Sequence, residues 1–220
     1  MINKENAVTR LADAISRIGN YKWPQRMTKT NEALLKAVGE LTGHKYDPEN
    51  LTPILNELGS ISRMLGATLT NTANPSMLEA GYKANVIPQS ASAVVDGRTL
   101  PGYEKELLDT VKSLVGEHVK VESLVSDIPL EVEFGGPLVD AMIAAIKSED
   151  PDGIPIPYLL SGGTDNKALA KLGIVGYGFS PLKLPPDLDF TGLFHGIDER
   201  VPIDSLQFGA RTLFHFLVNA

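Results

Sequence analysis

A predicted strand runs into a glycine turn at Tyr158-Leu159-Leu160-Ser161-Gly162-Gly163-Thr164-Asp165. Two adjacent glycines leave the backbone free to direct its N–H groups toward one point. The helix expected from Asp165 to Leu172 would add the partial positive charge of its N-terminus. These features predict a seat for an anion, either a carboxylate or a phosphate, over Ser161, Gly162, Gly163 and Thr164. The alternative is a tight strand-to-helix turn in which Thr164 caps the helix.

A candidate ligand lies further along the chain, in Phe194-His195-Gly196. His195 belongs to a proline-rich loop in which no core position requires an imidazole. Gly196 would permit close approach of a ligand, and a neutral imidazole is a common zinc ligand. Loops at the carboxyl ends of strands are where α/β sheets bind ligands. The alternative is a loop histidine that hydrogen-bonds to Asp198 or Glu199.

Composition narrows the classes of function. The chain has 220 residues, of which 43% are hydrophobic and 21% charged, and a net charge of -7. This is ordinary globular material for one large or two small domains. The acidic balance and the lack of a basic stripe argue against nucleic-acid binding. With no cysteine, the sequence offers no disulfide and no thiolate metal site, which fits the cytoplasm. No apolar run reaches the ~20 residues of a membrane span.

The first part of the chain mixes helical and strand patterns. A helix is predicted from Asn3, placed as its N-cap, and another after Gly102. Strands are predicted at residues 67–72, 77–83, 90–98 and 118–122. Two helical segments, at 34–41 and from Thr52 onward, form an insert. The order predicts a βαββαβ ferredoxin-like domain that lacks its first strand, which suggests a piece of a longer chain.

After Gly136 the pattern becomes α/β alternation. Helices are predicted at 138–146, 165–172 and 203–218, and strands at 154–160 and 174–179. This alternation predicts a parallel or mixed sheet with helices on its faces. Because these elements are too few to cover such a sheet, we expect part of the layer to lie elsewhere in a longer chain.

Two polar residues of the first part are further candidates. Arg98 ends the predicted strand 90–98, and its guanidinium could clamp a carboxylate; an exposed strand-end arginine paired with Asp96 or Glu104 is the alternative. The amide of Asn85 could stabilise an oxyanion, although an asparagine before a turn usually serves the turn itself. His44, His118 and His215 are predicted to be a loop residue, an exposed strand residue and a structural helix residue.

These segments occur in the order of a known family. The order is Asn85-Val86-Ile87-Pro88, Val95-Asp96-Gly97-Arg98, Ser161-Gly162-Gly163-Thr164-Asp165 and Phe194-His195-Gly196-Ile197-Asp198-Glu199. It resembles the co-catalytic zinc amidohydrolases, which include carboxypeptidase G-type enzymes, succinyl-diaminopimelate desuccinylase, acetylornithine deacetylase, aminoacylases and dipeptidases. The resemblance implies a lid or dimerisation domain at 1–133 and the C-terminal part of a catalytic α/β domain at 134–220.

The resemblance also implies roles. His195 matches the last metal ligand, Asn85 the oxyanion residue, and Arg98 with Ser161–Thr164 the residues that hold the substrate's free carboxylate. Family members bind two zinc ions through an upstream His-x-Asp and carboxylates that include a Glu-Glu pair. This sequence contains neither pattern. We therefore expect the chain to be inactive alone and not to bind zinc tightly, since catalytic zinc takes three protein ligands.

The function implied is hydrolysis of an amide bond in a small peptide or N-acyl amino acid by a metal-dependent enzyme. Family lids pair across a two-fold axis, so a homodimer is expected, with Asn85 or Arg98 serving the neighbour's site. Two alternatives stay open: a non-catalytic dimerisation or ligand-binding module, and a phosphate-binding α/β domain built on the Ser161–Thr164 turn.

Overall fold

The computed structural model describes residues 6–220, which form two compact units. Of the described residues, the hairpin unit comprises 6–27 and Ala67–Leu130, and the helical unit comprises Thr28–Gly66 and Glu131–Ala220. The helical insert predicted at 34–41 and from Thr52 onward therefore lies in the helical unit, because its residues contact that unit more than the hairpin unit. As functional domains, the lid at 1–133 and the catalytic part at 134–220 stay predictions.

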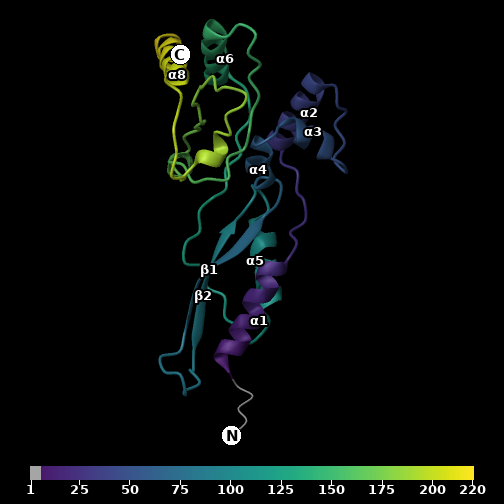
Figure 1. Cartoon of the computed structure of the whole chain (residues 1–220), viewed down its shortest axis with the longest axis vertical. Coiled ribbons are helices and arrows are strands. Elements are labelled where there is room, and N and C mark those ends of the chain that lie inside the picture. Colours follow the sequence, from purple (N-terminus) through teal and green to yellow (C-terminus); the bar gives the residue numbers. More distant parts are fainter. Residues whose placement is uncertain (1–5) are drawn as a thin grey trace. The chain divides into compact units, whose positions relative to one another are not determined.

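The hairpin unit is built on a two-stranded antiparallel sheet (Figure 1). Strand β1 (Thr72–Ala80) pairs with β2 (Ala91–Arg98), with Thr72 opposite Arg98 and Ala80 opposite Ala91. The register shifts between Pro75 and Met77. Proline has no N–H for the ladder, and a bulge is one of the few places in a sheet that accept it.

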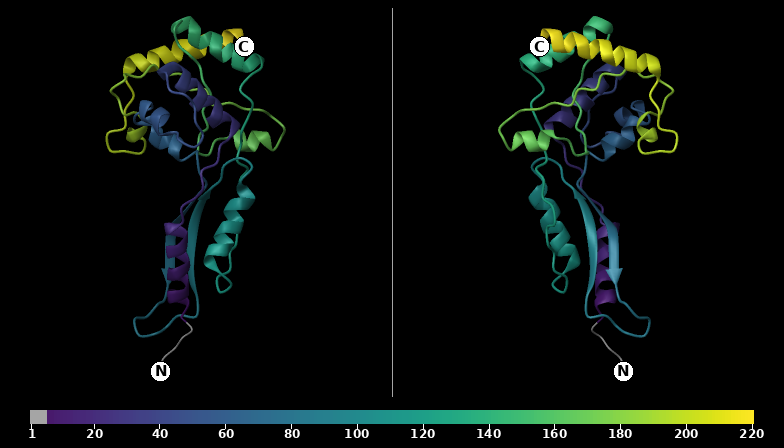
Figure 2. Two further views of the ribbon diagram at one scale, coloured as in Figure 1. Left: turned by 90° about the vertical axis from the view of Figure 1, so that its right-hand side faces the viewer. Right: turned by 90° about the vertical axis from the view of Figure 1, so that its left-hand side faces the viewer.

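Helices α1 (Ala7–Asn20) and α5 (Glu104–Val115) pack against each other and against this sheet. The Asn6 side chain caps α1 by accepting from the backbone N of Val8 at 2.9 Å. Asn3, the predicted cap, lies outside the described residues. The unit's buried core is made by both helices and β1: Ala14, Ile18, Ala73 and Val115. In Figure 2, α1 runs along the hairpin.

The strand predictions in this unit need correction. The strand predicted at 67–72 is wrong except at Thr72, because residues 67–71 precede β1 and only Thr70 forms an isolated bridge, with Gln25. The strand predicted at 77–83 forms as far as Ala80, as the end of β1, which continues through the bulge after Pro75. The strand predicted at 90–98 is confirmed as β2. The predicted strand 118–122 is absent among the described residues, where it has no ladder partner. Its alternation is nevertheless correct. Val119 and Val121 pack against the core, while His118 is exposed as predicted.

The first half of the helical unit contains α2 (Lys29–Thr42), α3 (Thr52–Glu57) and α4 (Ile61–Gly66). Thr28 caps α2 by accepting from the backbone N of Asn31 at 3.2 Å, and Gly43 ends it in the left-handed conformation, with φ 78°. Leu35 and Ile54 are fully buried between α2 and α3.

The second half contains α6 (Pro137–Glu149), α7 (Asn166–Ala170), the 3₁₀ turn η1 (Thr191–Leu193) and α8 (Ile203–Asn219). Helix α6 packs against α8. The strands predicted at 154–160 and 174–179 are wrong. A strand forms only when its backbone hydrogen-bonds to a neighbouring strand, and among the described residues these two segments have no such neighbour. Across residues 6–220, no helix combines the length and apolar character needed to cross a membrane.

Candidate functional site

The Ser161–Thr164 turn is exposed and precedes α7. Thr164 is not the N-cap, because the helix begins one residue later than predicted and Asp165 takes that position without a side-chain bond. The carbonyl of Thr164 instead accepts from the backbone N of Lys167 at 3.1 Å. A Cβ added at Gly163 would meet no atom within 4 Å, so this part of the turn is open to a ligand.

His195 is exposed and has a φ of 59°, in the left-handed region. Left-handed backbone costs an L-residue roughly 1–2 kcal/mol, so the surrounding loop must impose it. The backbone N of His195 donates to Oε2 of Glu199 at 3.2 Å. A Cβ at Gly196 would lie 3.0 Å from the carbonyl oxygen of Leu193, a tight contact that a glycine avoids.

The loop that carries His195 is tied down at Asp189. This carboxylate accepts from the backbone N of Gly192 at 3.0 Å and pairs with Arg63 of α4. The Arg63 guanidinium holds the pKa of the Asp189 carboxyl below its ordinary value, with the Gly192 N–H contributing in the same direction. The ion pair joins the inserted helices to the loop within the helical unit.

Arg98 ends β2 opposite Thr72, and its Nε donates to Oδ2 of Asp96 at 2.9 Å. This is the pairing that the sequence offered as the structural alternative. The side chain is half exposed. The observed bond engages Nε, whereas a bidentate clamp on a carboxylate draws on two guanidinium nitrogens.

Asn85 is exposed in the loop that joins β1 to β2, at the opposite end of the sheet from Arg98. At ~3.3 Å per residue, the strand from Ala91 to Arg98 alone spans about 23 Å. The structure therefore does not bring these two predicted site residues together within one chain.

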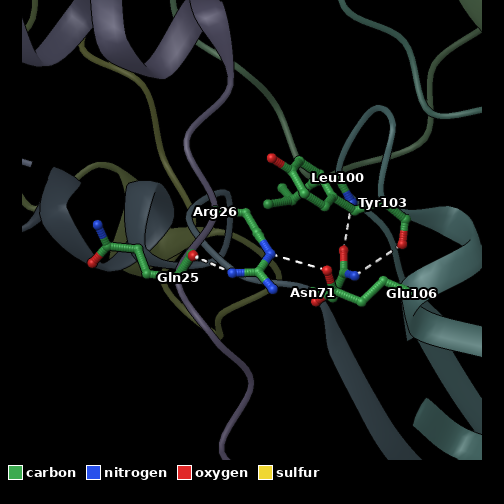
Figure 3. A network of polar contacts seen from close by, with 6 residues as sticks. All are labelled: Gln25, Arg26, Asn71, Leu100, Tyr103 and Glu106. Carbon is green, nitrogen blue, oxygen red and sulfur yellow. Dashed lines mark hydrogen bonds and ion pairs between the residues drawn. The ribbon is translucent and has the colours of Figure 1, made fainter. Parts of the chain in front are cut away.

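A buried asparagine near Arg98 was missed by sequence reasoning. Asn71, 1% exposed, accepts from the backbone N of Leu100 at 2.8 Å and donates to the carbonyl of Tyr103 at 3.1 Å. Beside it, Nε of Arg26 donates to Oε2 of Glu106 at 2.9 Å (Figure 3). The signal in the sequence was an amide within the β-branched run at 67–72. These contacts fix the Arg98 end of the hairpin.

The described residues do not form a zinc site. Between residues 6 and 220, no three histidine, aspartate or glutamate side chains come together in a group that could hold a metal ion. A catalytic zinc ion takes three protein ligands, and the surroundings of His195 offer too few.

Residues 3–122 match the family described as the peptidase dimerisation domain, M20. The chain belongs to this family. The resemblance inferred from the four ordered segments is thereby confirmed.

Relatives extend the similarity over the whole chain. The mouse N-fatty-acyl-amino acid synthase/hydrolase PM20D1 is 28% identical over 99% of this chain and 45% of its own length. The probable carboxypeptidase S-like 2 of Dictyostelium discoideum is 26% identical over 100% of this chain and 43% of its own. The chain spans less than half the length of these relatives.

A solved structure supports the fold. The M20 family metallo-carboxypeptidase Sso-CP2 of Sulfolobus solfataricus superposes with a TM-score of 0.54 at 18% identity, covering 100% of this chain and 56% of that one. The predicted fold class, a mixed α/β chain with a lid-type domain, is confirmed, although several predicted strands are not formed.

Proposed function

We propose that this chain supplies the dimerisation domain and part of the active site of a metal-dependent hydrolase that cleaves an amide bond in a small substrate with a free carboxylate. The observation that carries the proposal is the match to M20 relatives over nearly the whole chain. One of them is named for N-fatty-acyl-amino acids and another for carboxypeptidase activity, which supports an N-acyl amino acid or peptide substrate.

The exposed polar residues have separate tasks in this proposal. Arg98 and the open Ser161–Thr164 turn hold the substrate carboxylate. Asn85 donates its amide N–H to the oxyanion that develops when the scissile carbonyl is attacked. His195 is one ligand for the metal. Its partners and the general base come from outside this chain, so the chain alone is inactive. A cytoplasmic location is expected.

The enzyme is proposed to be a homodimer whose active sites are shared. Asn85 and Arg98 lie at opposite ends of one hairpin, whose strand from Ala91 to Arg98 is about 23 Å long, farther than a small substrate reaches. If both contact one substrate, they come from different protomers. In a dimer with two-fold symmetry, Asn85 of one protomer can lie beside Arg98 of the other. The symmetry repeats this arrangement and so creates two equivalent sites.

The test is a hydrolysis assay on two polypeptides. The coding sequence upstream of the Met1 codon is read, and the longer product of the same frame is expressed beside this chain. We expect the longer product to contain His-x-Asp and Glu-Glu and to release amino acid from N-acyl amino acids when zinc is present. The proposal fails if this chain alone with zinc is equally active, or if the longer product is inactive.

A non-catalytic dimerisation module is the second candidate. It is favoured by the family description and by the lack of a three-ligand metal group among the described residues. A module of this kind would form dimers, and neither polypeptide would hydrolyse or bind N-acyl amino acids. Phosphate binding has less support, since α7 has only five residues and its N-cap makes no side-chain bond.

A further inference from the structure

The segment that leads to His195 is a series of short hydrogen-bonded turns. Three backbone bonds of 2.9–3.2 Å close them: the N–H of Gly192 to the carbonyl of Asp189, that of Leu193 to Phe190, and that of Gly196 to Leu193. The rings of Phe190 and Phe194 pack edge to face across η1, with their centroids 5.2 Å apart. We therefore expect the backbone from Asp189 to Gly196 to move as one piece, so that the position of Asp189 determines that of His195.

The carboxylate of Asp189 connects this piece to the inserted helices. Its Oδ1 accepts from the backbone N of Gly192 at 3.0 Å, which folds the side chain over η1. A Cβ added at Gly192 would lie 2.5 Å from Oδ2, so the glycine leaves room for the carboxylate. The same Oδ2 pairs with the guanidinium of Arg63 on α4.

The structures on either side of this contact are themselves anchored. Helix α4 is held by Leu65, which is 3% exposed. The start of the loop is held by α8, where Ser205 is 2% exposed and its Oγ donates to the carbonyl of Lys183 at 2.7 Å. The ion pair at Asp189 thus ties the middle of the loop, close to His195, to a packed helix.

We propose that Arg63 is a positioning residue of the proposed hydrolase, which keeps His195 in its working place. The inference rests on the proposed function, in which His195 serves the active site. Arg63 acts through Asp189 and η1 and contacts neither the substrate nor the reacting atoms. The helical insert, to which the proposed function assigns no task, thereby contributes to the reaction.

This role differs from a contribution to folding. The side chains of Arg63 and Asp189 are 66% and 49% exposed, and an exposed ion pair adds little to global stability. Its effect is on where the loop lies. Because a displacement of about 1 Å can cost a reaction up to 10²-fold in rate, a weak contact can matter more for turnover than for unfolding.

The test compares kcat and KM for the release of amino acid from an N-acyl amino acid by the longer product with zinc present. We expect Arg63→Ala to lower kcat about threefold to tenfold and to change KM by less than about twofold. Arg63→Lys keeps the cation and should recover at least about half of the loss. Asp189→Asn keeps an acceptor for the Gly192 N–H but loses the charge, and adding Arg63→Ala to it should cause no further loss.

The matched control is Lys36→Ala, which removes an exposed cation of the same insert whose ion pair, with Glu32, lies within α2. It should keep the wild-type kcat. Two measurements on this chain do not depend on activity. The urea midpoint should be unchanged in Arg63→Ala and Asp189→Asn, and the ¹H–¹⁵N signal of Gly196 should shift in both but not in Lys36→Ala.

Equal losses in Arg63→Ala and Lys36→Ala would overturn the inference, as would additive losses in the double variant or an unmoved Gly196 signal. A urea midpoint that falls along with kcat would show a role in folding only and would overturn it too. An active longer product that tolerates Arg63→Ala sinks this inference and leaves the proposed function standing. An inactive longer product ends both.

Discussion

At the scale of single residues, the hydrogen bonds of one buried side chain, Asn71, position the Arg98 end of the hairpin. Asn71 is buried and joins the backbone at Leu100 and Tyr103 by both ends of its amide. A buried N–H or carbonyl without a partner costs about 1–3 kcal/mol. The side chain therefore holds the end of β2, and with it Arg98, in place.

We expect Asn71→Ala to lower the free energy of unfolding of the hairpin unit by about 1–3 kcal/mol, because it leaves the Leu100 N–H unpaired. The measurement is urea unfolding followed by the fluorescence of Trp23, the chain's one tryptophan, which packs against the unit's core. Asn74→Ala changes an exposed asparagine of β1 and should shift the value by no more than ~0.5 kcal/mol. Equal effects of the two substitutions would contradict this role.

At the scale of elements, the helices are predicted more reliably than the strands, of which 90–98 forms as β2 and 118–122 does not form among the described residues. The periodic apolar residues of α2, α5 and α8 are local signals, and each helix forms close to its expected range. A strand depends on a partner that the local sequence does not reveal. Residues 118–122 alternate correctly but pair with nothing among the described residues.

The candidate site shows the same limit. The types of His195, Arg98 and Asn85 suggested their chemistry, but their arrangement depends on register and loop backbone. Arg98 and Asn85 are separated by the length of β2, about 23 Å at ~3.3 Å per residue, because the register places them at opposite ends of the hairpin. The positive φ of His195 and the tether at Asp189 likewise follow from the folded loop.

The contact between α6 and α8 should depend on pH. Glu149 of α6 accepts from Nε of Arg211 at 2.6 Å and lies 3.2 Å from Nε2 of His215. Arg211 holds the pKa of the Glu149 carboxyl below its ordinary value, with a smaller effect from His215. A carboxyl whose pKa is lower in the folded state adds stability above its unfolded pKa, and this is lost as the pH falls through the folded value.

Glu149→Gln should therefore reduce the decline of the urea midpoint below pH 4.5, measured by circular dichroism of the helical signal. Asp152→Asn, at an exposed site of the same unit, should keep the wild-type decline. An unchanged slope in Glu149→Gln would show that this carboxylate does not link stability to pH.

At the scale of the whole molecule, the chain is proposed to act as half of a symmetric pair. Light scattering of the purified 23.7 kDa chain should give twice that mass. A monomer at micromolar concentration would argue against the shared active sites. It would leave the family membership of residues 3–122 untouched.

The central claim is that Asn85 and Arg98 of different protomers serve one hydrolytic site. The assay is the release of amino acid from an N-acyl amino acid by the longer product. Three samples are compared: the Asn85→Ala variant, the Arg98→Ala variant, and an equal mixture of the two that is unfolded and refolded together. Each variant alone should lose about 10²-fold or more in kcat/KM. In the mixture, half of the dimers carry both variants, each with one intact site, so we predict about a quarter of wild-type activity. A mixture no more active than its components would contradict the claim.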